Sequence, residues 1–144
     1  MTLHSVEARL CASGALALAA GVLYYAGARG AEPLTPALGA WGGSLPTLLH
    51  SAAFALLALA VSAPWPRLAP WVCSGWLALE AGFELLQRDG TARVLEAALP
   101  SAPSWLRAYL DGTFDPLDVL AAAAGALLAF LIATCTMADA EDAR

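Results

Sequence analysis

The sequence has few charged residues and no cluster of basic ones. Charged residues make up 13% of its 144 residues and hydrophobic residues 60%, whereas a soluble domain is about 25% charged. The seven basic residues are all arginines spread along the chain, and the formal net charge is −5. This acidic balance argues against nucleic acid as a partner. There is also no arginine-rich segment to bind anionic lipid headgroups.

Cysteine is equally sparse, and its three copies follow no metal-binding or redox spacing. Cys11, Cys73 and Cys135 lie far apart, each inside or at the end of a hydrophobic stretch. Because the sequence has no CxxC pair and no Cys/His cluster, it predicts neither a metal site nor a cofactor. An odd number of cysteines within apolar segments also argues against a disulfide framework. We interpret them as small buried apolar residues.

Strand-like alternation of polar and apolar residues is missing too, which argues against a membrane β-barrel. Instead, alanine- and leucine-rich blocks of about 20 residues recur, a length that crosses a hydrocarbon core of about 30 Å as a helix. The sequence therefore predicts an all-α membrane protein with one domain over residues 1–144. We expect a bundle of four transmembrane helices at roughly 9–28, 46–63, 71–87 and 116–137, with a short amphipathic helical segment between helices three and four.

The first hydrophobic block has a second interpretation, as a signal peptide. Arg9 precedes it, and Ala26-Gly27-Ala28 resembles a cleavage site. The block is long for the apolar region of a signal peptide, which is about 7–15 residues. We therefore expect it to be retained as a transmembrane helix.

Prolines and small residues indicate where the predicted helices begin and where they touch. Pro46 and Pro116 suit the first turn of a helix, and Thr113 or Asp115 would cap the fourth span. Small residues four positions apart allow two helices to approach closely. Such pairs are Ala17 with Gly21, Ala78 with Gly82, and Ala121 with Gly125.

Apolar residues recur at helical spacing between the third and fourth spans, over residues 88–114. Ala92, Leu95 and Leu99 form one series, and Trp105 and Tyr109 belong to another. Such series predict short amphipathic helices that lie on the membrane surface. A plain polar loop is the alternative.

Polar residues nevertheless stand inside the last three predicted spans. A charged side chain at the bilayer centre costs about 2.5–3.5 kcal/mol on insertion scales. A chain that keeps several such residues is therefore building a polar site or joining its helices. On the third span, Glu80, Glu84 and Gln87 are spaced so that they share one helix face. This shared face predicts a polar surface directed at a neighbouring helix.

The alternating directions of the spans bring polar residues from three helices to one side of the membrane. His50 starts the second span, Glu84 and Gln87 end the third, and Asp118 starts the fourth. This convergence favours a binding site. A structural network is the alternative, because helix N-termini favour aspartates by about 0.3–1 kcal/mol. The candidate residues are His50, Glu80, Glu84, Gln87, Arg88, Asp115 and Asp118.

Three short motifs follow one another through the second, third and fourth spans. Each places polar or aromatic residues at helical spacing. The motifs are His50-x-x-x-Phe54-x-x-Leu57, Glu84-Leu-Leu-Gln87, and Gly112-Thr-Phe-Asp115-Pro-Leu-Asp118 followed by Ala122 and Gly125.

The order and spacing of these motifs resemble the VanZ-like family of small bacterial membrane proteins, over roughly residues 45–131. Gly112 and Ala122 depart from the family's pattern, which often has Arg and Asn there. The resemblance implies an integral protein of the bacterial cytoplasmic (inner) membrane with a role in the cell envelope. It also implies a link to resistance against the glycopeptide teicoplanin. The partners it suggests are membrane lipids, a lipid-linked envelope intermediate or a membrane protein.

We expect a non-enzymatic binding protein, and two other functions stay open. A membrane-embedded hydrolase or transferase would use His50 and the carboxylates as acid and base. Its nucleophile would be Ser51, Ser74 or Thr113, none of which lies in a recognised motif. A proton-coupled transporter or channel subunit would relay protons through intramembrane Glu and His residues. The chain shows no internal repeat of the transporter kind.

Overall fold

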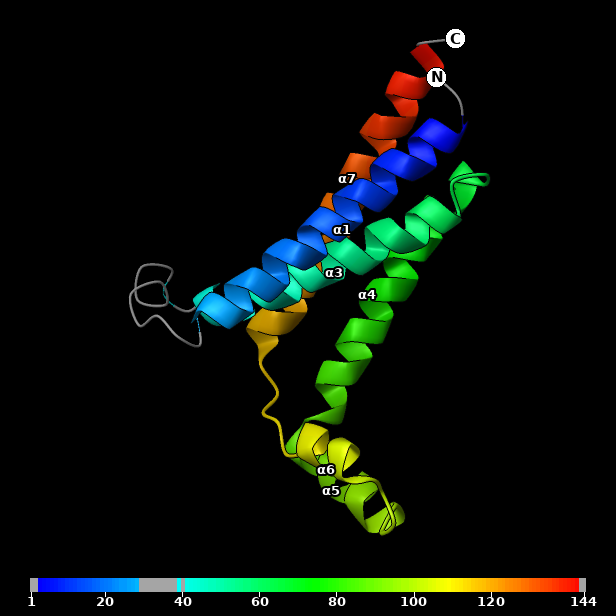
Figure 1. Ribbon diagram of the computed structural model, residues 1–144. Coiled ribbons are helices and arrows are strands. Elements are labelled where there is room, and N and C mark those ends of the chain that lie inside the picture. Colours follow the sequence, from blue (N-terminus) through cyan, green and yellow to red (C-terminus); the bar gives the residue numbers. More distant parts are fainter. Residues whose placement is uncertain (1–2, 29–38, 40, 143–144) are drawn as a thin grey trace.

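Every regular element in the described part of the chain is a helix. The computed structural model describes residues 3–28, 39 and 41–142 (Figure 1). The prediction of an all-α chain is confirmed for these residues. The elements are α1 (Leu3–Ala28), α3 (Trp41–Val61), the 3-10 helix η1 (Pro66–Leu68), α4 (Ala69–Leu86), α5 (Asp89–Ala98), α6 (Ser104–Leu110) and α7 (Pro116–Asp142).

Three of the described helices, α1, α3 and α7, are long and apolar enough to cross a membrane. Helices of this kind indicate a membrane protein. The 18 residues of α4 include Glu80 and Glu84, and α4 is not among the three. At 1.5 Å per residue α4 is about 27 Å long, slightly less than a hydrocarbon core of about 30 Å. The transmembrane span at 71–87 therefore stays a prediction.

The start of α3 differs from the prediction, because Pro46 lies inside this helix rather than in its first turn. Proline has no N–H, so it leaves the carbonyl of the residue four positions earlier, Gly42, without a helical hydrogen bond. The hydroxyl of Tyr24 on α1 donates to that carbonyl instead, at 2.9 Å. This tertiary partner offsets part of the cost of an internal proline. The helix therefore begins at Trp41, and His50 lies near its middle.

The helices α1, α3 and α7 pack side by side, with α3 and α7 running in the same direction and α1 in the opposite one (Figure 1). Most of their buried side chains are alanines, which lets the backbones approach closely. A Cβ atom added at Gly14 would lie 2.9 Å from Cγ of Leu57. At Gly125 it would lie 2.9 Å from the backbone nitrogen of Ala52. Neither position has room for a larger residue.

Two of the three predicted small-residue pairs mark real helix contacts. Gly21 approaches Leu49 on α3, and Gly125 approaches Ser51 on the same helix. The third pair was wrong, because no described atom lies within 4 Å of a Cβ added at Gly82. Small residues permit close approach but do not cause it, and alanine-rich chains contain such pairs by composition alone.

The helix α4 leaves the three-helix bundle at an angle (Figure 1). It begins beside the end of α3, after the proline-rich turn that contains η1. Only Ala69 and Cys73, in its first half, are buried. The four-helix bundle predicted from the sequence is not confirmed: α1, α3 and α7 pack side by side, and α4 packs on α3 and α7 mainly through its first half.

The helices α5 and α6 lie beyond the far end of α4, and the chain then returns to the start of α7 (Figure 1). The predicted helical segment between the third and fourth spans is therefore present, as two short helices. Val94 on α5 and Trp105 on α6 are 68% and 70% exposed. Apolar side chains this exposed favour the predicted place on the membrane surface, which stays a prediction.

Replacing Gly125 with alanine should destabilise the bundle, whereas Gly82→Ala should not. The added methyl at Gly125 meets backbone atoms that cannot move aside. Overpacking of this kind costs about 1–3 kcal/mol. At the open position 82, alanine should gain about 0.5–1 kcal/mol of helix stability. Thermal unfolding in detergent, followed by circular dichroism, measures both. Equal stabilities for the two variants would contradict the close α3–α7 approach.

Candidate functional site

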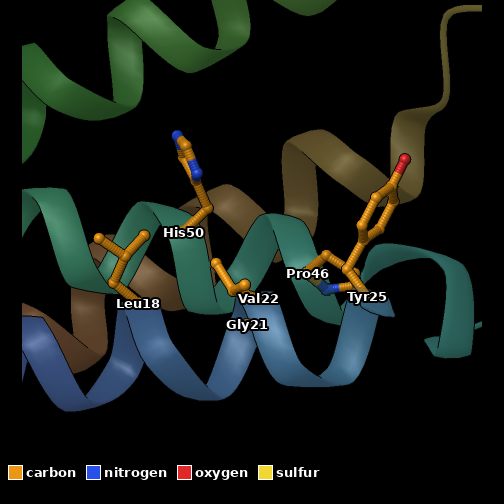
Figure 2. Close-up of a pocket in the computed structure, with 6 residues that line it drawn as sticks. All are labelled: Leu18, Gly21, Val22, Tyr25, Pro46 and His50. Atoms are coloured by element: carbon orange, nitrogen blue, oxygen red, sulfur yellow. The ribbon is translucent and has the colours of Figure 1, made fainter. Parts of the chain in front are cut away.

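The middle of α3 meets the middle of α4 through a contact between His50 and Glu80 and through a run of aromatic rings. Nε2 of His50 lies 3.8 Å from Oε1 of Glu80. The His50 ring packs against Phe54 one turn later, with ring centres 4.6 Å apart. Phe54 in turn stacks on Trp76 of α4, at 5.3 Å and 12° between the ring planes. Figure 2 shows His50 projecting from α3 toward α4. These contacts hold the diverging helix to the bundle.

One turn further along α4, Glu84 reaches the start of α7. Its Oε2 accepts a hydrogen bond from the backbone N–H of Asp115, at 3.5 Å. Oδ1 of Asp115 accepts from the N–H of Leu117 at 2.8 Å, which confirms this residue as the cap of α7 with Pro116 at the first helical position. Asp118 follows in the first turn of the helix. The same segment therefore caps α7 and contacts α4.

The structure brings five of the seven candidate residues together: His50, Glu80, Glu84, Asp115 and Asp118, here called the polar cluster. Glu84 lies close enough to the other three carboxylates for their charges to repel its own. Within the described residues, His50 is the only basic group within 4 Å of the four acids. The cluster is therefore rich in hydrogen-bond acceptors and short of positive charge.

Two carboxylate oxygens of the polar cluster have no hydrogen-bond partner among the described residues. They are Oε1 of Glu80 and Oδ1 of Asp118, and both atoms are buried. The whole Glu80 side chain is only 16% exposed, although His50 opposite it is 53% exposed. A buried acceptor that loses its water without gaining a partner costs about 1–3 kcal/mol. Nε1 of Trp76, one turn before Glu80 on α4, is also a buried donor without a partner in the described part of the chain, and it lies close to the Glu80 carboxylate. The hydrogen bonding around the polar cluster is therefore incomplete within the described residues, for donors as well as for acceptors.

The other two candidates, Gln87 and Arg88, lie outside the polar cluster. Nε2 of Gln87 donates to the backbone carbonyl of Tyr109 at 3.3 Å. This amide packs so tightly on Gly112 that a Cβ there would lie 2.8 Å from Nε2. The guanidinium of Arg88 lies over the ring of Phe114, 5.8 Å from its centre. Both residues join the end of α4 to the segment before α7.

Sequence reasoning missed the role of Tyr109, which docks α6 on the end of α4. Its hydroxyl donates to the backbone carbonyl of Phe83, and its ring meets the Phe83 ring edge-on. Burial raises the pKa of Tyr109, and the nearby charges of Glu84 and Glu80 raise it further. The helical spacing of Trp105 and Tyr109 predicted an amphipathic helix. It gave no sign that Tyr109 would face the carboxylates.

An apolar groove between α1 and α3 has one residue of the polar cluster, His50, in its lining. It has a volume of about 250 Å³ and is lined by Leu18, Gly21, Val22, Tyr25, Pro46 and His50 (Figure 2). Only His50 belongs to both the groove and the polar cluster. The imidazole therefore stands where an apolar surface meets the group of acids.

The nearest candidate nucleophile along α3 has a structural role. The hydroxyl of Ser51, the nearest candidate nucleophile along α3, is fully buried and donates to the backbone carbonyl of Ala122 at 3.0 Å. It is therefore engaged in holding α3 against α7. No three His, Cys, Asp or Glu side chains in the described part of the chain are arranged to hold a metal ion. The oxygen atoms of the cluster can accept hydrogen bonds from a cationic or hydroxyl-bearing group.

Comparisons of the chain with protein-family models, with curated proteins and with solved structures find no match. The functional interpretation therefore rests on the geometry of the polar cluster and on the motifs of the sequence. Of these motifs, His50-x-x-x-Phe54 has a direct structural reason, because both rings lie in the contact between α3 and α4.

Replacing Tyr109 with phenylalanine should loosen α6 from α4. The lost hydrogen bond is worth about 0.5–1.5 kcal/mol, so the α6 amides should exchange hydrogen faster. Trp105→Phe is the matched control, because Trp105 lies on the same helix and is 70% exposed.

The raised pKa of Tyr109, caused by burial and by the charges of Glu84 and Glu80, should give the wild-type protein a pH dependence. Because the pKa of Tyr109 in the folded protein is above the ordinary value of 10.0, the neutral phenol stabilises the folded state, and this contribution is fully present below pH 10.0. That contribution is lost as the pH rises through the folded-state pKa. Hydrogen exchange of α6 should therefore speed up above about pH 10 in the wild type beyond its intrinsic pH dependence. Tyr109→Phe should lack this step. An identical pH profile in both proteins would contradict the assignment.

Proposed function

We propose that this chain is an integral protein of the bacterial cytoplasmic membrane that binds a lipid, a lipid-linked envelope intermediate or a protein partner through the polar cluster. In this proposal the protein does not carry out a covalent reaction. His50 and the four carboxylates supply the polar contacts, and the apolar helices keep the site within or beside the bilayer.

The observation that carries the proposal is that two buried carboxylate oxygens, Oε1 of Glu80 and Oδ1 of Asp118, accept no hydrogen bond within the described residues, although Oε1 of Glu80 has Nε2 of His50 at 3.8 Å. They come from different helices, yet both belong to a group of acids with one histidine beside it. A purely structural network would be expected to satisfy its buried acceptors. A ligand that donates hydrogen bonds to these oxygens supplies the missing partners.

The resemblance to VanZ-like proteins supports a role in the cell envelope. The polar positions of the three motifs include His50, Glu84, Asp115 and Asp118, all of which belong to the polar cluster. A lipid-linked envelope intermediate therefore deserves a place among the ligands tested. The family's link to teicoplanin resistance leads to a prediction about the growth of cells. Expression of the chain should alter the growth of a susceptible bacterium on this glycopeptide, and inactive site variants should not.

Native mass spectrometry of the protein extracted from its own membrane tests the binding site. Wild type should carry a specific lipid or lipid-linked molecule that both Glu84→Gln and Asp118→Asn lose. Both changes keep the shape of the side chain and remove its charge. Glu96→Gln is the matched control, because it removes an exposed acid of α5 outside the polar cluster. The control should keep the ligand.

The same experiment separates a binding site from a structural network. If all four proteins carry the same lipids and only the cluster variants unfold at lower temperature, the acids serve to hold the helices together. The proposed function would then be wrong, because the polar cluster would have no ligand to lose.

A further inference from the structure

We propose that the ligand of the polar cluster is a phospholipid with a primary amine in its headgroup, of the phosphatidylethanolamine type. Its ammonium group lies among the carboxylates, and one acyl chain lies in the groove between α1 and α3. This inference rests on the proposed function and specifies the chemistry of the ligand. It follows from the charge of the site, from its buried oxygens that accept no hydrogen bond within the described residues and from the apolar groove that His50 also lines.

The charge of the polar cluster calls for a cation. Glu80, Glu84, Asp115 and Asp118 gather where three helices meet, and His50 is the only basic side chain of the described residues within 4 Å of them. The nearest arginine along the chain, Arg88, lies over Phe114 instead. Opposite charge nearby stabilises an ionised carboxylate, and the effect is larger where water is excluded. An ammonium group supplies this charge and favours the ionised form of the acids.

A buried hydroxyl beside the cluster points independently to a missing partner. The Ser44 side chain on α3 is 1% exposed, and its Oγ has no hydrogen-bond partner within the described residues. The contact between Ser51 and Gly125 fixes the register of α3 against α7. Two turns earlier on the same faces of these parallel helices lie Ser44 and Asp118. This register places Ser44 and Asp118 at the same level of the two helices, on the faces that meet at Ser51 and Gly125.

The hydrogen-bonding capacity of the site distinguishes a primary amine from a quaternary one. A primary ammonium donates three hydrogen bonds and accepts none, which suits a site where carboxylate oxygens of Glu80 and Asp118 accept no hydrogen bond within the described residues. A choline headgroup donates none and is usually held in a cage of aromatic rings. Here Phe54 and Trp76 stack on each other, with His50 against Phe54, so these rings form no cage. The site therefore favours ethanolamine over choline.

The apolar groove indicates that the amine belongs to a lipid rather than to a small soluble molecule. Leu18, Val22 and Pro46 line the groove, together with His50 of the polar cluster (Figure 2). The groove runs along two helices that are apolar enough to cross a membrane. An acyl chain in the groove would place its headgroup beside His50 and Glu80, which are 3.8 Å apart.

Binding of short-chain lipids to the purified full-length protein in detergent tests the inference, with native mass spectrometry as the readout. The probes are dioctanoyl phosphatidylethanolamine, phosphatidylcholine and phosphatidylglycerol, together with free ethanolamine. Wild type should bind the ethanolamine lipid about tenfold more tightly than the other two. Glu84→Gln and Ser44→Ala should each weaken this binding, and Glu96→Gln should leave it unchanged. Free ethanolamine should compete only weakly.

A second pair of variants tests the groove without touching the acids. Val22→Trp places a large side chain in the groove and should reduce binding of the ethanolamine lipid severalfold. Leu23→Trp is the matched control, because Leu23 is 72% exposed and does not line the groove. Circular dichroism checks that every variant keeps its helices. Equal binding by the two tryptophan variants would overturn the placement of the acyl chain.

The outcomes separate this inference from the proposed function. If all three lipids bind equally and Glu84→Gln weakens them all, the polar cluster binds lipid but does not select a primary amine, and only this inference fails. If free ethanolamine competes as strongly as the lipid, the ligand is a soluble amine and the groove has no role. If no lipid or amine depends on the cluster, and the native ligand is also unaffected by Glu84→Gln, the proposed function fails as well.

Discussion

The arrangement of the polar cluster depends on the close approach of α3 and α7 at Gly125. A Cβ atom at this position would lie 2.9 Å from the backbone of Ala52 and 3.1 Å from Cβ of Ser51. Next to this contact, Ser51 donates its hydroxyl across the helix interface to Ala122. Together these contacts fix the rotation and the register of both helices. With α3 set in this way, His50 faces α4, and the first turn of α7 meets Glu84.

The polar contacts matter because α4 has little other attachment beyond its first half. Apolar packing holds Ala69 and Cys73, and the aromatic stack of Phe54 on Trp76 follows. Beyond the stack, α4 touches the bundle through Glu80 and Glu84, whose contacts of 3.8 and 3.5 Å are long for strong hydrogen bonds. The helix thus carries its acids at the place where its packing ends.

Five of the seven residues that the sequence singled out do meet, but the sequence did not predict where along the helices they would do so. Spacing alone put Glu80 and Glu84 on one helix face, and alternating span directions brought them to His50 and Asp118. The depth of His50 depended on Pro46, which looked like a helix start. Five residues of α3 precede Pro46. The helix can include them because the hydroxyl of Tyr24 on α1 donates to the carbonyl of Gly42, which the proline leaves without a helical hydrogen bond. Contacts of this kind leave no local pattern, and the departure of α4 from the bundle and the docking of Tyr109 were missed for the same reason.

The position of His50 along α3 determines how deep in a membrane this part of the polar cluster would lie. From Trp41 to His50 is nine residues along α3, or about 14 Å at 1.5 Å per residue, which is close to half of a hydrocarbon core of about 30 Å. Of the acids, Glu80 lies beside His50, whereas Asp115 and Asp118 lie at the start of α7. Glu80 therefore cannot rely on bulk water to stabilise its charge. It must be protonated, or be reached by water along α4, or be held beside a cation. Buried oxygens of Glu80 and Asp118 that accept no hydrogen bond within the described residues favour the last condition, because a bound cation with hydrogens to donate satisfies charge and hydrogen bonding at once.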